Sequence, residues 1–177
     1  VEDGTEDAQK PCVGFAFAAT HVTKGWPADH IADTIQSLSA DVRWILIGGP
    51  TDVSQLEILR AAGVPAAIPH SCEASLETLT GIIAHLDVLV GVDTGPVHLA
   101  RLLNVKTLSL FGPTSIKRWG PGGFDENMHQ ALSLNLECQP CSNHGGPACP
   151  LSHHKCMHEM TPDSVVNKLS EMLELKR

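Results

Sequence analysis

The fold is decided by residues 88–103, VLVGVDTGPVHLARLL, in which a short apolar run is followed at once by an amphipathic one. The run Val88–Val92 is typical of a strand that is buried on both faces of a sheet. Pro96 suits the first turn of a helix, and the apolar residues after it keep helical spacing to about Leu103. A buried strand that leads directly into a helix is the repeating unit of a parallel sheet.

The same alternation extends from this segment in both directions along the chain. Short apolar runs predict strands at residues 13–18, 42–47, 64–68, 107–111 and 131–136. Amphipathic runs predict helices at residues 27–38, 54–62, 75–86 and 161–175. We therefore expect an α/β fold, a Rossmann-like parallel sheet with helices on both faces. In such a sheet, ligands bind beyond the carboxyl ends of the strands.

Length and composition fit one globular domain. The chain has 177 residues, of which 42% are hydrophobic and 18% charged. A net charge of 12 − 20 = −8 argues against a nucleic-acid partner, because such binding needs Lys and Arg to neutralise phosphates. No run approaches the roughly 20 apolar residues that span a bilayer. Residues 1–10 are expected to be a poorly ordered linker remnant of a longer chain, and 11–177 to form the domain.

The turn between strand 88–92 and the following helix carries the strongest chemical signal. A helix start presents free backbone N–H groups and the positive end of its dipole, and Thr94 and Gly95 let the backbone approach an anion closely. Asp93 can accept hydrogen bonds from sugar hydroxyls, and His98, one turn into the helix, can donate to a phosphate or hydroxyl. The same residues also suit a capped strand-to-helix turn with no ligand.

Two further turns follow predicted strands and should meet at the same edge of the sheet. After the first strand, Lys24 is a cation suited to a diphosphate, and Trp26 is expected to pack and fix the loop. After strand 107–111, the turn Gly112–Thr114 offers the hydroxyl of Thr114. Each turn taken alone is better explained as an ordinary surface loop, and their convergence is what favours a binding site.

Taken in order, these motifs resemble a known family. The succession Lys-x-Trp-Pro, Gly-Gly-Pro, Asp-Thr-Gly-Pro-x-His-x-Ala and Phe-Gly-Pro-Thr resembles the carboxyl-terminal domain of glycosyltransferase family 9, the lipopolysaccharide heptosyltransferases. The Cys-x-Pro-Cys…Cys-Pro-x-x-His-His-x-Cys-Met tail is also similar to members of that family. The resemblance covers about residues 11–177, and the block from Asp93 to Thr114 is its most specific part.

The resemblance implies one half of a GT-B enzyme, in which two Rossmann-like domains face each other across a cleft. This half would bind the sugar-nucleotide donor, commonly ADP-heptose, while a missing amino-terminal domain would bind the lipopolysaccharide core acceptor and supply the general base. Lys24 is the implied catalytic residue, because its charge would stabilise the departing diphosphate. The implied donor-binding residues are Thr20, Thr23, Asp52, Asp93, Thr94, Gly95, Pro96, His98, Gly112, Pro113 and Thr114.

For the protein as a whole, the resemblance implies an inverting transferase that needs no cofactor for catalysis. This chain alone would bind donor and transfer nothing. The implied location is cytoplasmic, at the inner face of the bacterial inner membrane, with contact to the membrane surface only through the acceptor.

Four cysteines crowd into the loop at residues 138–156. Their spacing, Cys138-x2-Cys141-x7-Cys149-x6-Cys156, suits a tetrahedral structural site for zinc or iron, although it is not the spacing of a zinc ribbon. Two disulfides or free thiols are the alternatives, and the resemblance extends to a transferase subfamily with cysteine-bound iron. Two other functions stay open: a sugar-nucleotide epimerase of the same fold, and a non-catalytic, metal-stabilised interaction module.

Overall fold

The computed structural model describes residues 9–175 and contains a five-stranded sheet in which every pair of neighbouring strands is parallel. The strand order is β2-β1-β3-β4-β5, so the chain changes direction across the sheet between β1 and β3. The strands are β1 (Cys12–Ala16), β2 (Arg43–Ile47), β3 (Val88–Val92), β4 (Lys106–Leu110) and β5 (His129–Leu132). A reversal of this kind opens a crevice at the carboxyl ends of the two central strands.

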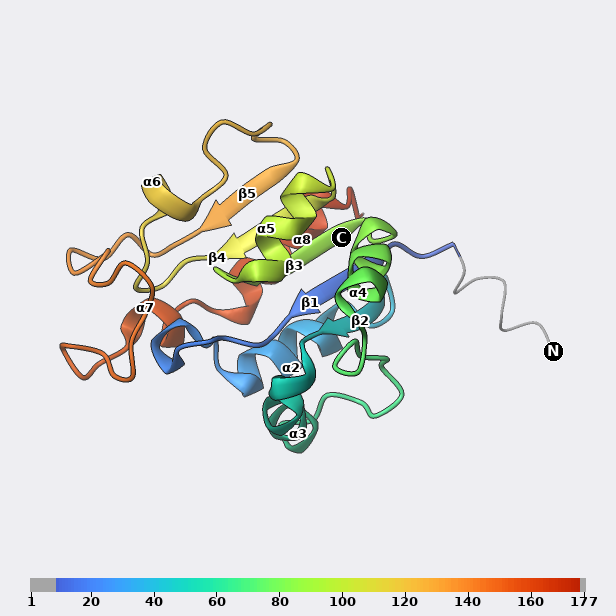
Figure 1. Ribbon diagram of the computed structural model, residues 1–177, viewed down its shortest axis with the longest axis horizontal. Coiled ribbons are helices and arrows are strands. Elements are labelled where there is room, and N and C mark those ends of the chain that lie inside the picture. The colour runs from blue at the N-terminus through green and yellow to red at the C-terminus, as the bar shows by residue number, and fades with distance from the viewer. Residues whose placement is uncertain (1–8, 176–177) are drawn as a thin grey trace.

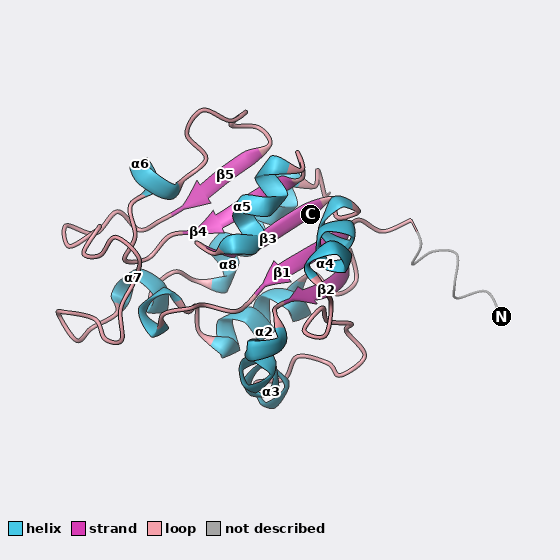
Figure 2. Cartoon of the chain, viewed as in Figure 1, coloured by secondary structure: helices cyan, strands magenta, loops and turns pink. Residues whose placement is uncertain are grey.

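Helices cover both faces of the sheet (Figure 1), as the sequence predicted. One face carries α2 (Ala28–Ser37), α3 (Val53–Ala61) and α8 (Pro162–Met172), and the other carries α4 (Leu76–Ala84) and α5 (Gly95–Leu102). Shorter elements are η1 (Val22–Lys24), η2 (Pro50–Asp52), α6 (Ile116–Trp119) and α7 (Lys155–His158). Figure 2 shows that the strands point to one side of the molecule, where the long loops gather. Among residues 9–175, no helix is long and apolar enough to cross a membrane.

Two predicted strands differ from the structure. Residues 64–68 form no strand, and the sheet gains only a single parallel bridge between Leu46 and His70. Pro65 and Pro69 explain this, because proline has no N–H to donate to a ladder. The last strand begins at His129 and ends at Leu132, whereas residues 131–136 were predicted. It ends early because the chain turns at Asn135, which has a φ of 52°.

The predictions for the two ends of the chain, a final helix at residues 161–175 and a linker at residues 1–10, have different outcomes. The final helix forms, with Thr161 accepting a hydrogen bond from the Ser164 amide at its start, and it ends at Met172 instead of about residue 175. The linker prediction for residues 1–10 falls mainly on residues 1–8, which lie outside the described part of the chain.

The close approach of β1 and β3 makes a glycine necessary in the centre of the sheet. A Cβ at Gly91 would lie 2.6 Å from the Ala16 Cβ and 2.7 Å from the Ala16 carbonyl oxygen. We expect Gly91→Ala to lower the free energy of unfolding by roughly 1–3 kcal/mol, measured by urea denaturation. Gly81 in α4 is the matched control, because a Cβ there meets no atom within 4 Å. Gly81→Ala should raise stability by about 0.5–1 kcal/mol, and equal effects of the two changes would contradict the packing argument.

Candidate functional site

A cavity of about 530 Å³ opens at the carboxyl ends of β1, β2 and β3, where the strand order reverses. Its walls come from the loops after β1 and β2 and from the start of α5. Small residues in these loops leave the space open. The lining residues are Ala16, Ala18, Ala19, Thr20, Ile47, Gly48, Gly49, Thr51, Asp52, Gln55, Leu79, Thr94, Gly95 and Pro96. The sequence placed a ligand at this edge, and five of its candidates line the cavity: Thr20, Asp52, Thr94, Gly95 and Pro96.

The amino-terminal end of α5 forms one wall of this cavity. Thr94 is the residue before the first helical turn, and its hydroxyl donates to the Val92 carbonyl at 3.1 Å instead of capping the helix. A Cβ at Gly95 would meet no atom within 4 Å, so space lies beside the backbone there. Backbone N–H groups at the start of a helix, left without a side-chain cap, favour an anion in that space.

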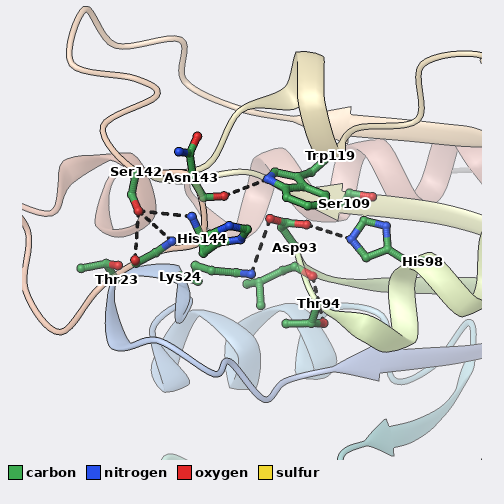
Figure 3. Close-up of polar contacts among 12 residues, drawn as sticks. Thr23, Lys24, Asp93, Thr94, His98, Ser109, Trp119, Ser142, Asn143 and His144 are labelled. Atoms are coloured by element: carbon green, nitrogen blue, oxygen red, sulfur yellow. Dashed lines mark hydrogen bonds and ion pairs between the residues drawn. The ribbon is translucent and has the colours of Figure 1, made fainter.

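Next to Thr94, a cluster of charged side chains surrounds Asp93 (Figure 3). The Lys24 Nζ lies 3.5 Å from Asp93 Oδ2, and the His98 Nε2 lies 3.1 Å from Asp93 Oδ1. Asp93 is buried, with 5% of its surface exposed, while the His98 side chain is 38% exposed. Burial acts to raise the pKa of Asp93, but the hydrogen bond from His98 and the charge of Lys24 outweigh it. The carboxyl pKa is therefore lowered, and Asp93 is an anion held by two donors.

The three residues of the Gly112–Thr114 turn lie in different surroundings: Thr114 is near Asp93, whereas Gly112 and Pro113 contact the carboxyl-terminal part of the chain. Thr114 is buried. Its hydroxyl makes no hydrogen bond of ordinary geometry among the described residues, but it lies near enough to Asp93 to help lower the pKa of that carboxyl. Gly112 packs on Met157, where a Cβ would lie 2.3 Å from the sulfur. The Pro113 carbonyl accepts hydrogen bonds from the amides of Cys141 and Ser142. Only Thr114 of this predicted trio therefore reaches the charged cluster.

The two threonines of the Lys24 loop have different places. Thr20 is exposed at the cavity, whereas Thr23 is buried against the cysteine-rich loop. The Thr23 hydroxyl accepts from the Gly146 amide at 2.8 Å and donates to the Gly146 carbonyl at 3.0 Å, and the His154 ring contacts the Thr23 carbonyl at 2.7 Å. Thr23 thus ties the Lys24 loop to a segment more than 120 residues away, a role that the sequence did not predict.

Asp52 lines the cavity and also fixes the turn beside it. Its Oδ2 accepts a hydrogen bond from the Gly49 amide at 2.7 Å, which holds the Gly48–Gly49 turn in place. The opposite oxygen contacts the Thr51 hydroxyl at 3.4 Å. The carboxylate therefore shapes the cavity wall at the end of β2.

Sequence reasoning missed three residues beside the charged cluster: Arg101, Ser109 and Trp119. Arg101 is buried, and its guanidinium contacts the His98 ring, the Ser109 hydroxyl and the Trp119 carbonyl. Trp119 lies above Asp93 in Figure 3, and its indole N–H donates to the Asn143 carbonyl at 2.8 Å. The spacing of three residues between His98 and Arg101 places both on one helix face, a signal from which Arg101 could have been found.

The four clustered cysteines do not form the predicted four-thiolate metal site. Among residues 9–175, no three His, Cys, Asp or Glu side chains are placed to hold one metal ion, and all six cysteines are free. Three of the thiols, Cys141, Cys149 and Cys156, line a small cavity of about 160 Å³. The nearby backbone amides of His154 and Leu151 lower the pKa of the Cys149 thiol. Burial, with the nearby Cys141 and Cys149, raises the pKa of Cys156 to about 11.

The lowered pKa of Asp93 makes a prediction about stability at acid pH. A carboxylate whose pKa is lower in the folded state stabilises the fold above its unfolded pKa, about 3.9, and this contribution is lost as pH falls through the folded value. Asp93→Asn should therefore lose less stability than the unchanged chain between about pH 5 and pH 2. Urea unfolding across this range tests it, and parallel pH profiles for the two proteins would contradict it.

The fold is that of one half of a GT-B glycosyltransferase. The Escherichia coli ADP-heptose lipopolysaccharide heptosyltransferase II has a similar structure, with a TM-score of 0.72 and 23% identity, over 94% of this chain and 47% of that one. The E. coli heptosyltransferase WaaC, solved with ADP, has a TM-score of 0.67 and 26% identity, over 94% and 45%. The family 9 model, described as heptosyltransferase, matches residues 2–150, and this chain belongs to glycosyltransferase family 9.

The relatives are about twice as long as this chain. The lipooligosaccharide heptosyltransferase 2 of Campylobacter jejuni is 28% identical over 157 residues, which is 85% of this chain and 47% of that protein. The chain thus spans about half the length of the curated relatives it matches. A further similar structure, the iron-containing dodecameric glycosyltransferase TibC of enterotoxigenic E. coli, has a TM-score of 0.68 and 16% identity, over 94% and 47%. It shows the same fold.

Proposed function

We propose that this chain is the donor-binding half of an inverting glycosyltransferase that transfers heptose from ADP-heptose to a lipopolysaccharide core acceptor. The observation that carries the proposal is that a cavity and a charged cluster lie side by side at one edge of the sheet. A cavity large enough for a nucleoside ends at the uncapped start of α5, and the Lys24–Asp93–His98 cluster begins at the next residue. These features match the three parts of a sugar nucleotide in their chemical order.

Each part of the donor has a place in this proposal. The nucleoside occupies the cavity, with Asp52 and Gln55 on the wall available to its ribose hydroxyls. The diphosphate lies at the amino-terminal end of α5, beside Thr94 and Gly95. The sugar reaches Asp93, whose anionic oxygens accept hydrogen bonds from its hydroxyls.

The proposed chemistry is a direct displacement at the anomeric carbon. The acceptor hydroxyl loses its proton to a general base and attacks this carbon as the bond to the diphosphate breaks, which inverts the configuration. Negative charge then grows on the diphosphate, and Lys24 and the α5 dipole stabilise it. The base and the acceptor site belong to the half of the family's proteins that this chain does not span. No step is assigned to a metal or another cofactor.

The proposed cellular location of the enzyme follows from the location of its acceptor. A transferase that acts on the inner core of lipopolysaccharide works in the cytoplasm, at the inner face of the inner membrane, where its lipid-linked acceptor lies. This chain would take part through the sugar nucleotide and through its partner domain.

A thermal-shift panel of ADP, UDP, GDP and ADP-heptose tests the donor assignment. A ligand that binds only the folded state stabilises it by about 2.7 kcal/mol at a hundredfold excess over Kd. We expect ADP and ADP-heptose to raise the melting temperature and UDP and GDP to have little effect. Stabilisation by UDP alone would overturn the ADP-heptose assignment and favour an epimerase-like site. No response to any nucleotide would favour a non-catalytic interaction module.

A further inference from the structure

We propose that Arg101 is a positioning residue of the donor site. Its guanidinium holds the His98 ring with Nδ1 as the acceptor and Nε2–H directed at Asp93, and its charge adds to that of Lys24 where the diphosphate would lie. Sequence motifs gave this residue no role, and its guanidinium lies behind the charged cluster. The role in donor binding rests on the proposed function, whereas the effect on His98 does not.

Arg101 is fixed from three directions. It is 4% exposed, and its Nη2 donates to the hydroxyl of Ser109, a fully buried residue in β4, at 2.6 Å. Its Nη1 donates to the carbonyl of Trp119 in α6 at 2.8 Å. The same Nη1 lies 3.3 Å from Nδ1 of His98. Because β4, α5 and α6 all hold the guanidinium, it has one position, and this position faces the His98 ring.

This contact determines which nitrogen of His98 carries a proton. A guanidinium has five N–H donors, no acceptor, and stays protonated in proteins. Nδ1 of His98 must therefore accept, which leaves the single proton on Nε2, where it is donated to Asp93 at 3.1 Å. The groups that face this ring are Asp93 after β3, Arg101 on the same helix and the Trp119 ring at 6.3 Å, with Lys24 beyond Asp93.

Arg101 also changes the charge that a ligand meets. The negative charge of Asp93 acts on Arg101 as well as on Lys24. Lys24 and Arg101 are two cations and Asp93 is one anion, so these three groups leave a net charge of +1 beside the proposed diphosphate position. Without Arg101, Asp93 would neutralise Lys24 completely, and an anion would gain little there.

The test combines the protonation of His98 with the affinity for ADP, both in the complete 177-residue chain. Long-range 1H–15N spectra of the imidazole at about pH 8 report which ring nitrogen carries the proton, and His98→Asn identifies the signal. We expect the proton on Nε2 in the unchanged chain and a fraction of rings protonated on Nδ1 in Arg101→Met. At about pH 8, where an ordinary histidine is neutral, Arg101→Met should bind ADP about tenfold more weakly.

Three further variants make the result decisive. Arg101→Lys keeps a charge and a donor, and it should recover the ring protonated on Nε2 and most of the ADP affinity. Ser109→Ala removes one anchor of the guanidinium and should give a smaller fraction of rings protonated on Nδ1, which tests the inference even if Arg101→Met does not fold. Arg60→Met is the control, since Arg60 binds the carbonyls of residues 64, 65 and 68, remote in sequence from the cluster.

The outcomes separate the two proposals. A proton on Nδ1 of His98 in the unchanged chain, or identical spectra for that chain and a folded Arg101→Met, would overturn the role of Arg101. If the unchanged chain bound no ADP, the proposed function would fail, and the His98 spectra would still decide whether Arg101 positions the ring.

Discussion

Replacing Lys24 by alanine is expected to weaken ADP binding by about ten- to a hundredfold. A hydrogen bond to a charged group contributes about 1.5–3 kcal/mol, and each 1.4 kcal/mol is a factor of ten in affinity. The Lys24 side chain is only 12% exposed, so its charge acts where water screens it little. Isothermal titration with ADP measures the loss directly.

Two variants distinguish a role in the site from a general effect of charge. Lys117→Ala removes an exposed lysine that lines a different cavity, and it should leave ADP affinity unchanged. Lys24→Arg keeps the charge but changes the shape of the donor, so we expect partial recovery. Equal affinity in Lys24→Ala and the unchanged chain would remove Lys24 from the proposed mechanism.

Replacing Trp26 by alanine should lower the free energy of unfolding by about 3–5 kcal/mol, the usual loss for a large buried aromatic residue. Trp26 is 5% exposed, and its ring stacks on Phe15 with 6.1 Å between centroids. Its indole N–H donates to the Met160 carbonyl at 3.0 Å. The side chain therefore joins the sheet, the Lys24 loop and the segment before α8, as the sequence predicted for a residue that fixes this loop.

Urea unfolding followed by circular dichroism measures this loss. Trp26→Phe is the matched variant, because it keeps an aromatic ring against Phe15 and loses only the hydrogen bond and part of the volume. We expect it to cost clearly less than Trp26→Ala. A loss below about 1 kcal/mol in Trp26→Ala would show that the loop is held by other contacts.

The central strands and their turns were predictable because they depend on local sequence. Val88–Val92 is buried at every position, as is typical of a strand in the interior of a parallel sheet. Thr94, Gly95 and Pro96 follow it directly, so their place at the sheet edge follows from topology. The strand predicted at residues 64–68 was wrong because its apolar pattern was given more weight than its prolines.

The parts that could not be predicted depend on contacts between distant segments. Nothing near Thr23 in the sequence indicates that its hydroxyl contacts Gly146, so the sequence could not decide between Thr20 and Thr23 as a donor contact. The spacing of the cysteines indicates a metal site, but only the folded loop shows that, among residues 9–175, no three ligand side chains are placed to hold one ion. The sequence places Arg101 on the same helix face as His98, but it does not show that Ser109 of β4 and the Trp119 carbonyl of α6 anchor its guanidinium.

The bond between Thr23 and Gly146 has a consequence for the way the protein is made. The chain leaves the ribosome from its amino-terminal end, and domains fold as their segments emerge. β1, β3 and α5 are available early, but the loop that carries Lys24 lacks its partners at Gly146, His154 and Met160 until most of the chain has been synthesised. A nascent chain that ends before these residues would have the edge of the sheet, but the loop that carries Lys24 would not yet be held in position. Competence to bind the nucleotide should therefore arise late in translation, after the sheet has begun to form.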